Sequence, residues 1–68
     1  MIKTIIQNSV LTIQINRPDK KNALTRAMYA DMAAALHQAE TDDQIRVALI
    51  TGTADSFTSG NDLMDFIN

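Results

Sequence analysis

The N-terminal segment has the alternation of apolar and polar residues that is typical of β-strands. Residues 2–7 are rich in β-branched side chains, and residues 10–16 alternate in polarity. Asn8 and Ser9 between them suit a two-residue turn. The pattern predicts an antiparallel hairpin with one buried face, and Pro18 ends its second strand because it has no N–H for the ladder. The residues expected on the buried face are Leu11, Ile13 and Ile15.

The next segment has the spacing of an amphipathic helix. Apolar residues recur three or four positions apart over residues 28–39, and the Ala-rich composition favours a helix further. Thr25 is the expected N-cap. The polar run 41–43 breaks the pattern, so we expect the helix to end at Glu40 or Thr41. The apolar face consists of Met28, Tyr29, Met32, Ala35, Leu36 and Ala39.

Residues 45–51 form a further apolar segment, which lacks alternation over Val47–Ile50. Such a segment is typical of a strand that is covered on both faces, and Gly52 ends it. A strand, a helix and a second strand fit a right-handed βαβ crossover. Several apolar residues beyond this strand lack an evident partner in the preceding sequence. They are Phe57, Leu63, Met64, Phe66 and Ile67.

The predicted fold class is α/β, and the order of the elements indicates the N-terminal part of a larger domain. A β-hairpin, a helix, a buried strand and the start of a second helix follow one another over 68 residues. A chain of roughly 60 residues buries only about 60% of its extended surface, so its core is marginal. We therefore interpret residues 1–68 as a truncated N-terminal fragment of a single domain.

Composition excludes several classes of protein. A hydrophobic content of 46% is that of a globular chain rather than a disordered one. The net charge of −2 argues against general nucleic-acid binding, and the apolar runs are too short to span a bilayer. The N-terminus lacks a signal-peptide pattern, and a chain with one His and no Cys offers no metal site. We expect a cytoplasmic protein that binds no nucleic acid, membrane or metal.

Four of the six basic residues fall within residues 17–26. They are Arg17, Lys20, Lys21 and Arg26, set against one acidic residue, Asp19. The C-terminal part is acidic, because residues 39–68 carry one basic and six acidic residues. Charge blocks are commonly exposed surface, so the cluster alone does not define a site.

A loop of small residues, Ser59-Gly60-Asn61-Asp62, follows the last predicted strand. It matches a capping pattern, so we expect Ser59 to cap a helix with Asp62 at its third position. Gly60 allows a left-handed or tight backbone. The N–H of Asn61 would then be a free first-turn donor, suited to a carbonyl oxygen that gains negative charge. An ordinary helix cap explains the same spacing, so both interpretations stay open.

Two separated motifs stand on either side of the predicted helix and the strand that follows it. The first covers residues 16–24 and reads Asn-Arg-Pro-x-Lys-Lys-Asn-Ala-Leu. The second covers residues 57–63 and reads Phe-x-Ser-Gly-Asn-Asp-Leu. Between them stand a helix with Met28-Tyr29 and the strand that begins Ile-Arg-Val at residue 45. Together they resemble the N-terminal part of the crotonase superfamily, the enoyl-CoA hydratase/isomerase family. The resemblance covers the whole chain in the right order, and two motifs at the expected distance are far more specific than either alone.

This resemblance implies a spiral fold of repeated ββα turns, of which the chain would hold the first and part of the second. It also implies an acyl-CoA thioester as ligand and no separate cofactor, since coenzyme A is part of the substrate. In the family, the backbone of the Asn-Ala-Leu loop contacts the CoA portion, which carries over to Ala23, with Lys20 and Lys21 near the phosphates. The substrate-binding residues implied are Lys20, Lys21, Ala23, Ser59, Gly60, Asn61, Asp62 and Leu63.

The resemblance also implies a catalytic role for one backbone group. In the family, the residue after the Gly of the second motif donates one of two N–H groups to the thioester oxygen, and that position here is Asn61. Family members often have Ala there, but a backbone donor does not depend on the side chain. The Ser-Gly-Asn-Asp-Leu form resembles the peroxisomal-type enoyl-CoA isomerases and their bacterial relatives, which favours an isomerase over a hydratase.

The implied mechanism is enolate chemistry, in which two N–H donors polarise the thioester and a carboxylate moves the α-proton. In the family, the second donor and the carboxylates lie beyond the position of residue 68. None of the eight acidic residues here matches their motifs, so we expect the chain alone to be inactive. Oligomers are common in the family, so the resemblance also implies a homo-oligomer for the full-length protein. The alternative is a natural truncated, non-enzymatic module that binds acyl-CoA or a partner subunit.

Overall fold

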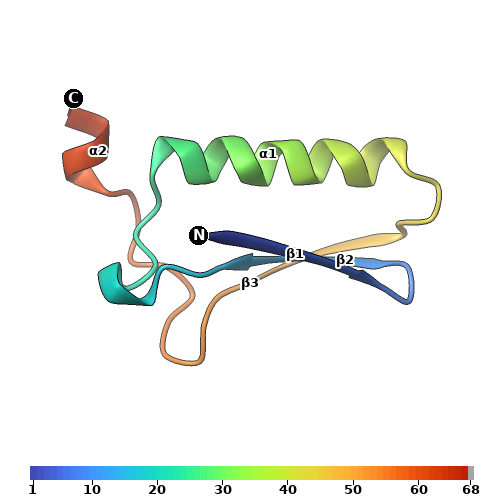
Figure 1. The fold of residues 1–68 in the computed structure, drawn as a ribbon, viewed down its shortest axis with the longest axis horizontal. Coiled ribbons are helices and arrows are strands. Elements are labelled where there is room, and N and C mark those ends of the chain that lie inside the picture. Colours follow the sequence, from blue (N-terminus) through green and yellow to red (C-terminus); the bar gives the residue numbers. More distant parts are fainter. Residues whose placement is uncertain (68) are drawn as a thin grey trace.

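The computed structural model describes residues 1–67, which fold as a three-stranded sheet with a long helix along one face (Figure 1). A short second helix lies beyond the N-terminal end of the long one (Figure 1). The elements are β1 (Ile2–Gln7), β2 (Val10–Ile15), the 3₁₀ helix η1 (Pro18–Lys20), α1 (Arg26–Thr41), β3 (Val47–Thr51) and α2 (Leu63–Ile67).

β1 and β2 form the predicted antiparallel hairpin. Their register runs from Ile2 opposite Ile15 to Gln7 opposite Val10. The two turn residues, Asn8 and Ser9, have φ angles of 53° and 65°. Positive φ at both central residues is the geometry whose twist matches that of the flanking strands, so the turn itself sets the register.

α1 begins and ends where its sequence pattern predicts. The Thr25 hydroxyl accepts a hydrogen bond from the N–H of Met28 at 3.1 Å, which satisfies one of the donors left open at a helix start. The helix extends to Thr41. Two members of the predicted apolar face differ from the rest, because Tyr29 is 43% exposed and Leu36 is 42% exposed.

β3 is the edge strand of the sheet, which corrects the prediction of a strand covered on both faces. It pairs in parallel with β2 in the order β1-β2-β3, so the predicted crossover through α1 is present. Its side chains are nevertheless exposed, by 53% at Val47 and 50% at Leu49. The reason is that side chains project from the two faces of a strand, and among residues 1–67 the core that α1 covers contains residues of β2 but none of β3. The lack of alternation over Val47–Ile50 correctly indicated an apolar strand. The burial of that strand depends on neighbouring elements, which the sequence pattern does not specify.

The core lies between β2 and α1. Leu11 and Ile13 are fully buried and Ile15 is 2% exposed, as the alternation predicted. The other core residues are Leu24, Met28, Met32, Ala35 and Ile45.

Most of the apolar side chains near the C-terminus are exposed, as expected from the sequence. Leu63 and Met64 are each 72% exposed, and Ile67 is 75% exposed. Phe66 differs from that expectation, because its ring contacts the Tyr29 ring and the Arg26 guanidinium.

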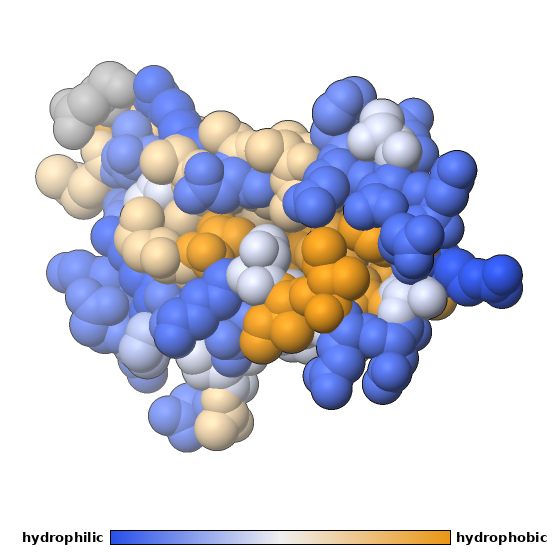
Figure 2. Space-filling model, turned by 45° about the vertical axis from the view of Figure 1, so that its right-hand side comes forward, coloured by the Kyte–Doolittle hydropathy of each residue, from blue (hydrophilic) through white to orange (hydrophobic). Residues whose placement is uncertain are grey.

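Figure 2 shows strongly hydrophobic side chains near the middle of one face of the molecule, between hydrophilic borders. Neither α1 nor α2 combines the length and the apolar character that a helix needs to cross a bilayer.

The assignment of the core face is testable by truncating one side chain on each face of the hairpin. Ile13→Ala should lower the free energy of unfolding by about 2–5 kcal/mol, because it leaves a cavity in the core. Ile5→Ala, at a position 62% exposed on β1, should lower it by less than about 1 kcal/mol. Urea unfolding followed by circular dichroism measures both values. Equal losses would contradict the assignment.

Candidate functional site

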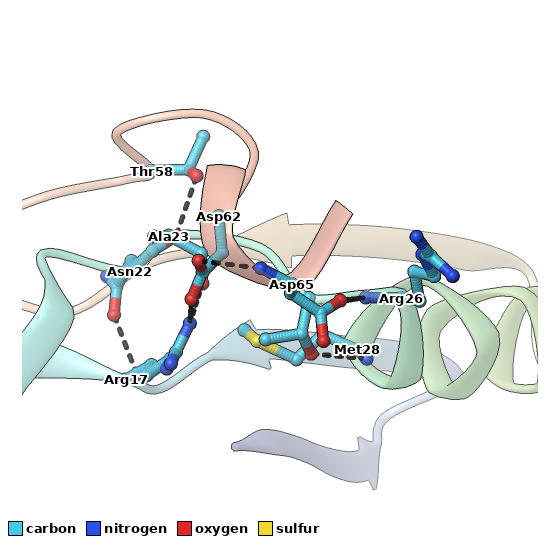
Figure 3. Close-up of polar contacts among 9 residues, drawn as sticks. Arg17, Asn22, Ala23, Arg26, Met28, Thr58, Asp62 and Asp65 are labelled. Carbon is cyan, nitrogen blue, oxygen red and sulfur yellow. Dashed lines mark hydrogen bonds and ion pairs between the residues drawn. The ribbon is translucent and has the colours of Figure 1, made fainter. Parts of the chain in front are cut away.

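Asn22 joins the two loops that carry the sequence motifs. It is fully buried and has a φ of 58°. Its amide nitrogen donates to the Thr53 hydroxyl at 3.1 Å and to the Ser56 carbonyl at 2.8 Å. Its own carbonyl accepts a 2.7 Å hydrogen bond from the Thr58 hydroxyl (Figure 3). The sequence analysis named this residue only as part of the first motif and assigned it no role. Its residue type was the available indication, because Asn tolerates the left-handed conformation that this loop needs.

A short parallel bridge between Leu24 and Asn61 fixes the second loop against the first. The Leu24 N–H donates to the Gly60 carbonyl and the Asp62 N–H donates to the Leu24 carbonyl, both at 2.8 Å. In this arrangement Leu24 uses both of its backbone groups, whereas the N–H and C=O of Asn61 turn away from it. Among residues 1–67, the Asn61 N–H donates to no protein group. The bridge therefore leaves one backbone donor available.

The prediction that Ser59 caps the second helix is wrong, because Asp62 occupies that position. The Asp62 carboxylate accepts from the N–H of Asp65 at 3.2 Å, and its carbonyl accepts from Asp65 and Phe66. Gly60 has a φ of 102°, so the chain reverses there and continues extended through Asn61 before α2 begins. Asn61 thus precedes the cap and is not a first-turn donor. Its N–H is available because of the bridge, not because of the helix.

A cleft of about 560 Å³ lies beside this bridge. It is lined by Arg17, Lys20, Ala23, Asn61, Asp62, Leu63 and Met64. The structure thus brings together five of the residues that the resemblance implied, and both motifs contribute to them.

The remaining implied residues lie outside this lining. Lys21 has a φ of 51° at the end of η1, and it lines a separate pocket of about 280 Å³. That pocket is also lined by Pro18, Thr53, Asp55 and Ser56. Ser59 and Gly60 are not among the residues that line the larger cleft. The left-handed backbone at Lys21 explains why two adjacent lysines line different pockets.

Arg17 and Asp62 form a half-buried ion pair in the wall of the larger cleft. The Nη1 of Arg17 lies 2.7 Å from the Oδ2 of Asp62, and the two side chains are 17% and 19% exposed. The same nitrogen donates to the Ala23 carbonyl at 3.1 Å (Figure 3). The hydrogen bond from Arg17, followed by that from the Asp65 N–H, lowers the pKa of the Asp62 carboxyl below its usual range. This carboxylate therefore stays ionised in mildly acidic solution.

The four clustered basic residues have different surroundings. Arg17 pairs with Asp62, and the Arg26 guanidinium donates to the Phe66 carbonyl at 2.9 Å while it lies over the Phe66 ring. Lys20 and Lys21 are exposed to solvent. The two lysines are therefore the members of the cluster best placed to meet an anion.

The side chain of Asn61 makes its own contact with α1. Its Oδ1 accepts a 2.6 Å hydrogen bond from the Tyr29 hydroxyl. The Tyr29 ring also meets the Phe66 ring edge to face, with centroids 6.1 Å apart. Tyr29 therefore uses its polar end at the surface, which explains why it departs from the predicted apolar face.

The cleft has few groups that could move a proton or hold a metal. Asp62 is the acidic residue that lines it, and Arg17 already neutralises that carboxylate. Within residues 1–67, no group of three or more His, Cys, Asp or Glu side chains could hold a metal ion. The lining does offer a hydrogen-bond donor, because the Asn61 N–H donates to no protein group among residues 1–67.

Comparison with known proteins decides the family. A sequence model of the enoyl-CoA hydratase/isomerase family matches residues 5–68, nearly the whole chain. The chain belongs to the enoyl-CoA hydratase/isomerase family.

Some similar members of the enoyl-CoA hydratase/isomerase family are named isomerases, and others are named hydratases. The peroxisomal enoyl-CoA delta isomerase 3 of Mus musculus is 44% identical over 62 residues, which is 91% of this chain and 19% of that protein. The probable peroxisomal enoyl-CoA hydratase 1 of Arabidopsis thaliana is 44% identical over 54 residues, which is 79% of this chain and 20% of that protein. The chain spans about a fifth of the length of these relatives.

The same family appears among solved structures. The enoyl-CoA hydratase/isomerase from Pseudoalteromonas atlantica T6c superposes with a TM-score of 0.95 at 51% identity. The match covers 98% of this chain and 27% of that one. The expected fold, the opening of the crotonase spiral, is therefore confirmed.

The lowered pKa of Asp62 predicts how stability depends on pH. Above the usual Asp pKa of about 3.9, the carboxylate is ionised in the folded and the unfolded chain, and the ion pair contributes in full. As the pH falls further, the unfolded chain binds the proton first, and the contribution disappears as the pH passes through the lower folded-state pKa.

We therefore predict that Asp62→Asn costs most stability at neutral pH and progressively less in acid. Arg17→Gln should remove the larger part of this pH-dependent contribution, because it deletes the ion-pair partner and leaves the hydrogen bond from the Asp65 N–H. Urea unfolding of the three proteins between about pH 7 and pH 2 measures the difference. A difference that stays constant or grows toward acid would contradict this assignment.

Proposed function

We propose that this chain forms the acyl-CoA-binding N-terminal part of an enoyl-CoA isomerase or hydratase. In this proposal, the Asn61 N–H is one of two donors that stabilise the thioester enolate. The observation that carries it is the Leu24–Asn61 bridge, which leaves this N–H without an acceptor among residues 1–67, in a residue that lines the cleft. Membership of the enoyl-CoA hydratase/isomerase family supports the choice of ligand.

The position of Ala23 supports the path of the coenzyme A portion. Ala23 and Asn61 line the same cleft, and Leu24, which follows Ala23, forms the bridge to Asn61. A thioester oxygen at the Asn61 N–H would therefore leave the CoA portion beside Ala23. Lys20 lines this cleft and Lys21 lines the neighbouring pocket, so either ammonium can approach a phosphate.

A backbone donor is consistent with Asn at this position. The side-chain oxygen of Asn61 is engaged by the Tyr29 hydroxyl, which directs that polar group toward α1. The N–H needs no particular side chain to donate. One well-placed donor of this kind is worth about 2.7–4 kcal/mol in a transition state, because negative charge develops on the oxygen that it contacts.

The chain supplies half of such a site. Proton transfer at the α-carbon needs a base, and Asp62 is a poor one because its hydrogen bond from Arg17 lowers its pKa. The second donor and the acid/base groups must therefore come from other segments. No separate cofactor is needed, since coenzyme A is part of the substrate.

The form Ser-Gly-Asn-Asp-Leu at residues 59–63 favours isomerisation of the double bond over addition of water. The relatives of Mus musculus and Arabidopsis thaliana, an isomerase and a probable hydratase by name, are equally identical to this chain. The choice therefore rests on this motif.

A hybrid protein tests the proposed function. Residues 1–68 replace the matching segment of the peroxisomal enoyl-CoA delta isomerase 3, which is 44% identical over 62 residues and supplies the remainder of the fold. The hybrid should isomerise a 3-enoyl-CoA, whereas the 68-residue chain alone should stay at the background rate. Turnover by the chain alone would show that it holds its own base and would overturn the half-site proposal.

Removal of a single N–H tests the role of Asn61. An amide-to-ester replacement at residue 61 of the hybrid, introduced through the α-hydroxy acid analogue of Asn, should lower kcat by about 100- to 1,000-fold. Asn61→Ala is the matched control, because it keeps the N–H and loses the contact with Tyr29, and it should lose far less activity. If the ester and the Ala variant lose activity equally, the backbone N–H is not the donor.

A further inference from the structure

One nitrogen of Arg17 connects the two segments that the bridge joins. Nη1 donates to the Ala23 carbonyl at 3.1 Å and to the Asp62 carboxylate at 2.7 Å (Figure 3). Ala23 precedes one member of the bridge, and Asp62 follows the other. With 17% and 19% of the side chains exposed, this pair is screened less than an ion pair on the open surface. Arg17 therefore holds both sides of the bridge at once.

The bridge needs such support because it is short. It consists of two hydrogen bonds, and no strand among residues 1–67 continues it on either side. Backbone N–H groups of an extended segment alternate in direction, so a slip of one residue would turn the Asn61 N–H toward Leu24. The N–H of a neighbouring residue would then face outward. Register thus decides which donor a ligand meets.

Arg17 can support the register because its own backbone is fixed. Its N–H donates to the side chain of the buried Asn22 at 2.7 Å, and its carbonyl accepts from the Asn22 N–H at 2.8 Å. At the other end, the second carboxylate oxygen of Asp62 accepts from the Asp65 N–H. Both partners of the ion pair are therefore fixed by further hydrogen bonds, so the pair can hold the second loop at a defined position relative to the first.

We propose that Arg17 is a positioning residue, which holds the Leu24–Asn61 bridge in the register that presents the Asn61 N–H to a bound thioester. This inference rests on the proposed function, in which that N–H is the donor. The Asp62 carboxylate neutralises the guanidinium, so Arg17 acts through the geometry of the bridge and not through its charge on the ligand.

The first measurement needs no ligand. In Arg17→Gln, the bridge amides of Leu24 and Asp62 should exchange their hydrogens about tenfold faster, while those of the β1–β2 ladder keep their rates. Arg46→Gln is the matched control, since Arg46 is exposed and its backbone bonds to Ser9 at the hairpin turn, away from the cleft. Unchanged exchange of both bridge amides in folded Arg17→Gln would overturn the proposal.

The second measurement isolates the carbonyl of the ligand. Butyryl-CoA and its thioether analogue S-butyl-CoA differ in the thioester oxygen alone. The chain should bind the thioester about two- to tenfold more tightly, by the contribution of one hydrogen bond. In Arg17→Gln this ratio should fall to about one, and Arg17→Lys, which keeps the charge but replaces the planar guanidinium with an ammonium, should lie between. A purely electrostatic role predicts that Arg17→Lys keeps the full ratio, which would overturn positioning.

The two measurements separate this inference from the proposed function. A ratio of one in the unaltered chain would refute the Asn61 donor, whereas a ratio that survives Arg17→Gln would refute positioning alone. If the 68-residue chain binds these ligands too weakly to measure, the ratio of the affinities for butyryl-CoA and S-butyl-CoA can be measured in the hybrid protein instead. If Arg17→Gln does not fold, Asp62→Asn replaces it, because it removes the same ion pair. We expect the same faster exchange of the bridge amides and the same fall in the affinity ratio.

Discussion

The parallel bridge between Leu24 and Asn61 determines which backbone group this chain can offer to a ligand. Leu24 uses its N–H and C=O on either side of Asn61, so the N–H of Asn61 turns to the opposite side. The bridge forms because Asn22, fully buried, binds the loop that follows β3 through its side-chain amide and its carbonyl. The cleft and its donor are therefore consequences of contacts between segments far apart in the chain.

Local patterns predicted the hairpin, α1 and β3 as elements of the fold, but not the 3₁₀ helix η1. The hairpin follows from alternation and a two-residue turn, and α1 follows from its spacing and from Thr25, because each signal lies within a few residues of the structure that it specifies. The exposure of β3 was not predictable in this way. A strand's burial depends on which neighbours cover it, and that is a property of the sheet.

The sequence predicted five of the residues that line the candidate cleft, but neither its complete lining nor its geometry. The two motifs identified Ala23 and Asn61, which line one cleft, through resemblance to a family. The cap was assigned to Ser59 because the local pattern fits it equally well, whereas the backbone at Gly60 has a positive φ and Asp62 is the residue that caps α2. The ion pair between Arg17 and Asp62 joins residues 45 positions apart, so no local pattern predicts it.

The most direct test of the central claim observes the Asn61 N–H itself. Nuclear magnetic resonance of the ¹⁵N-labelled chain, titrated with butyryl-CoA and then with S-butyl-CoA, reports the environment of this amide proton in each complex. A hydrogen bond to the thioester oxygen predicts a large downfield shift of the Asn61 amide proton with the thioester and little shift with the thioether. An amide proton that does not move, or that moves equally with both ligands, would contradict a donor role for Asn61.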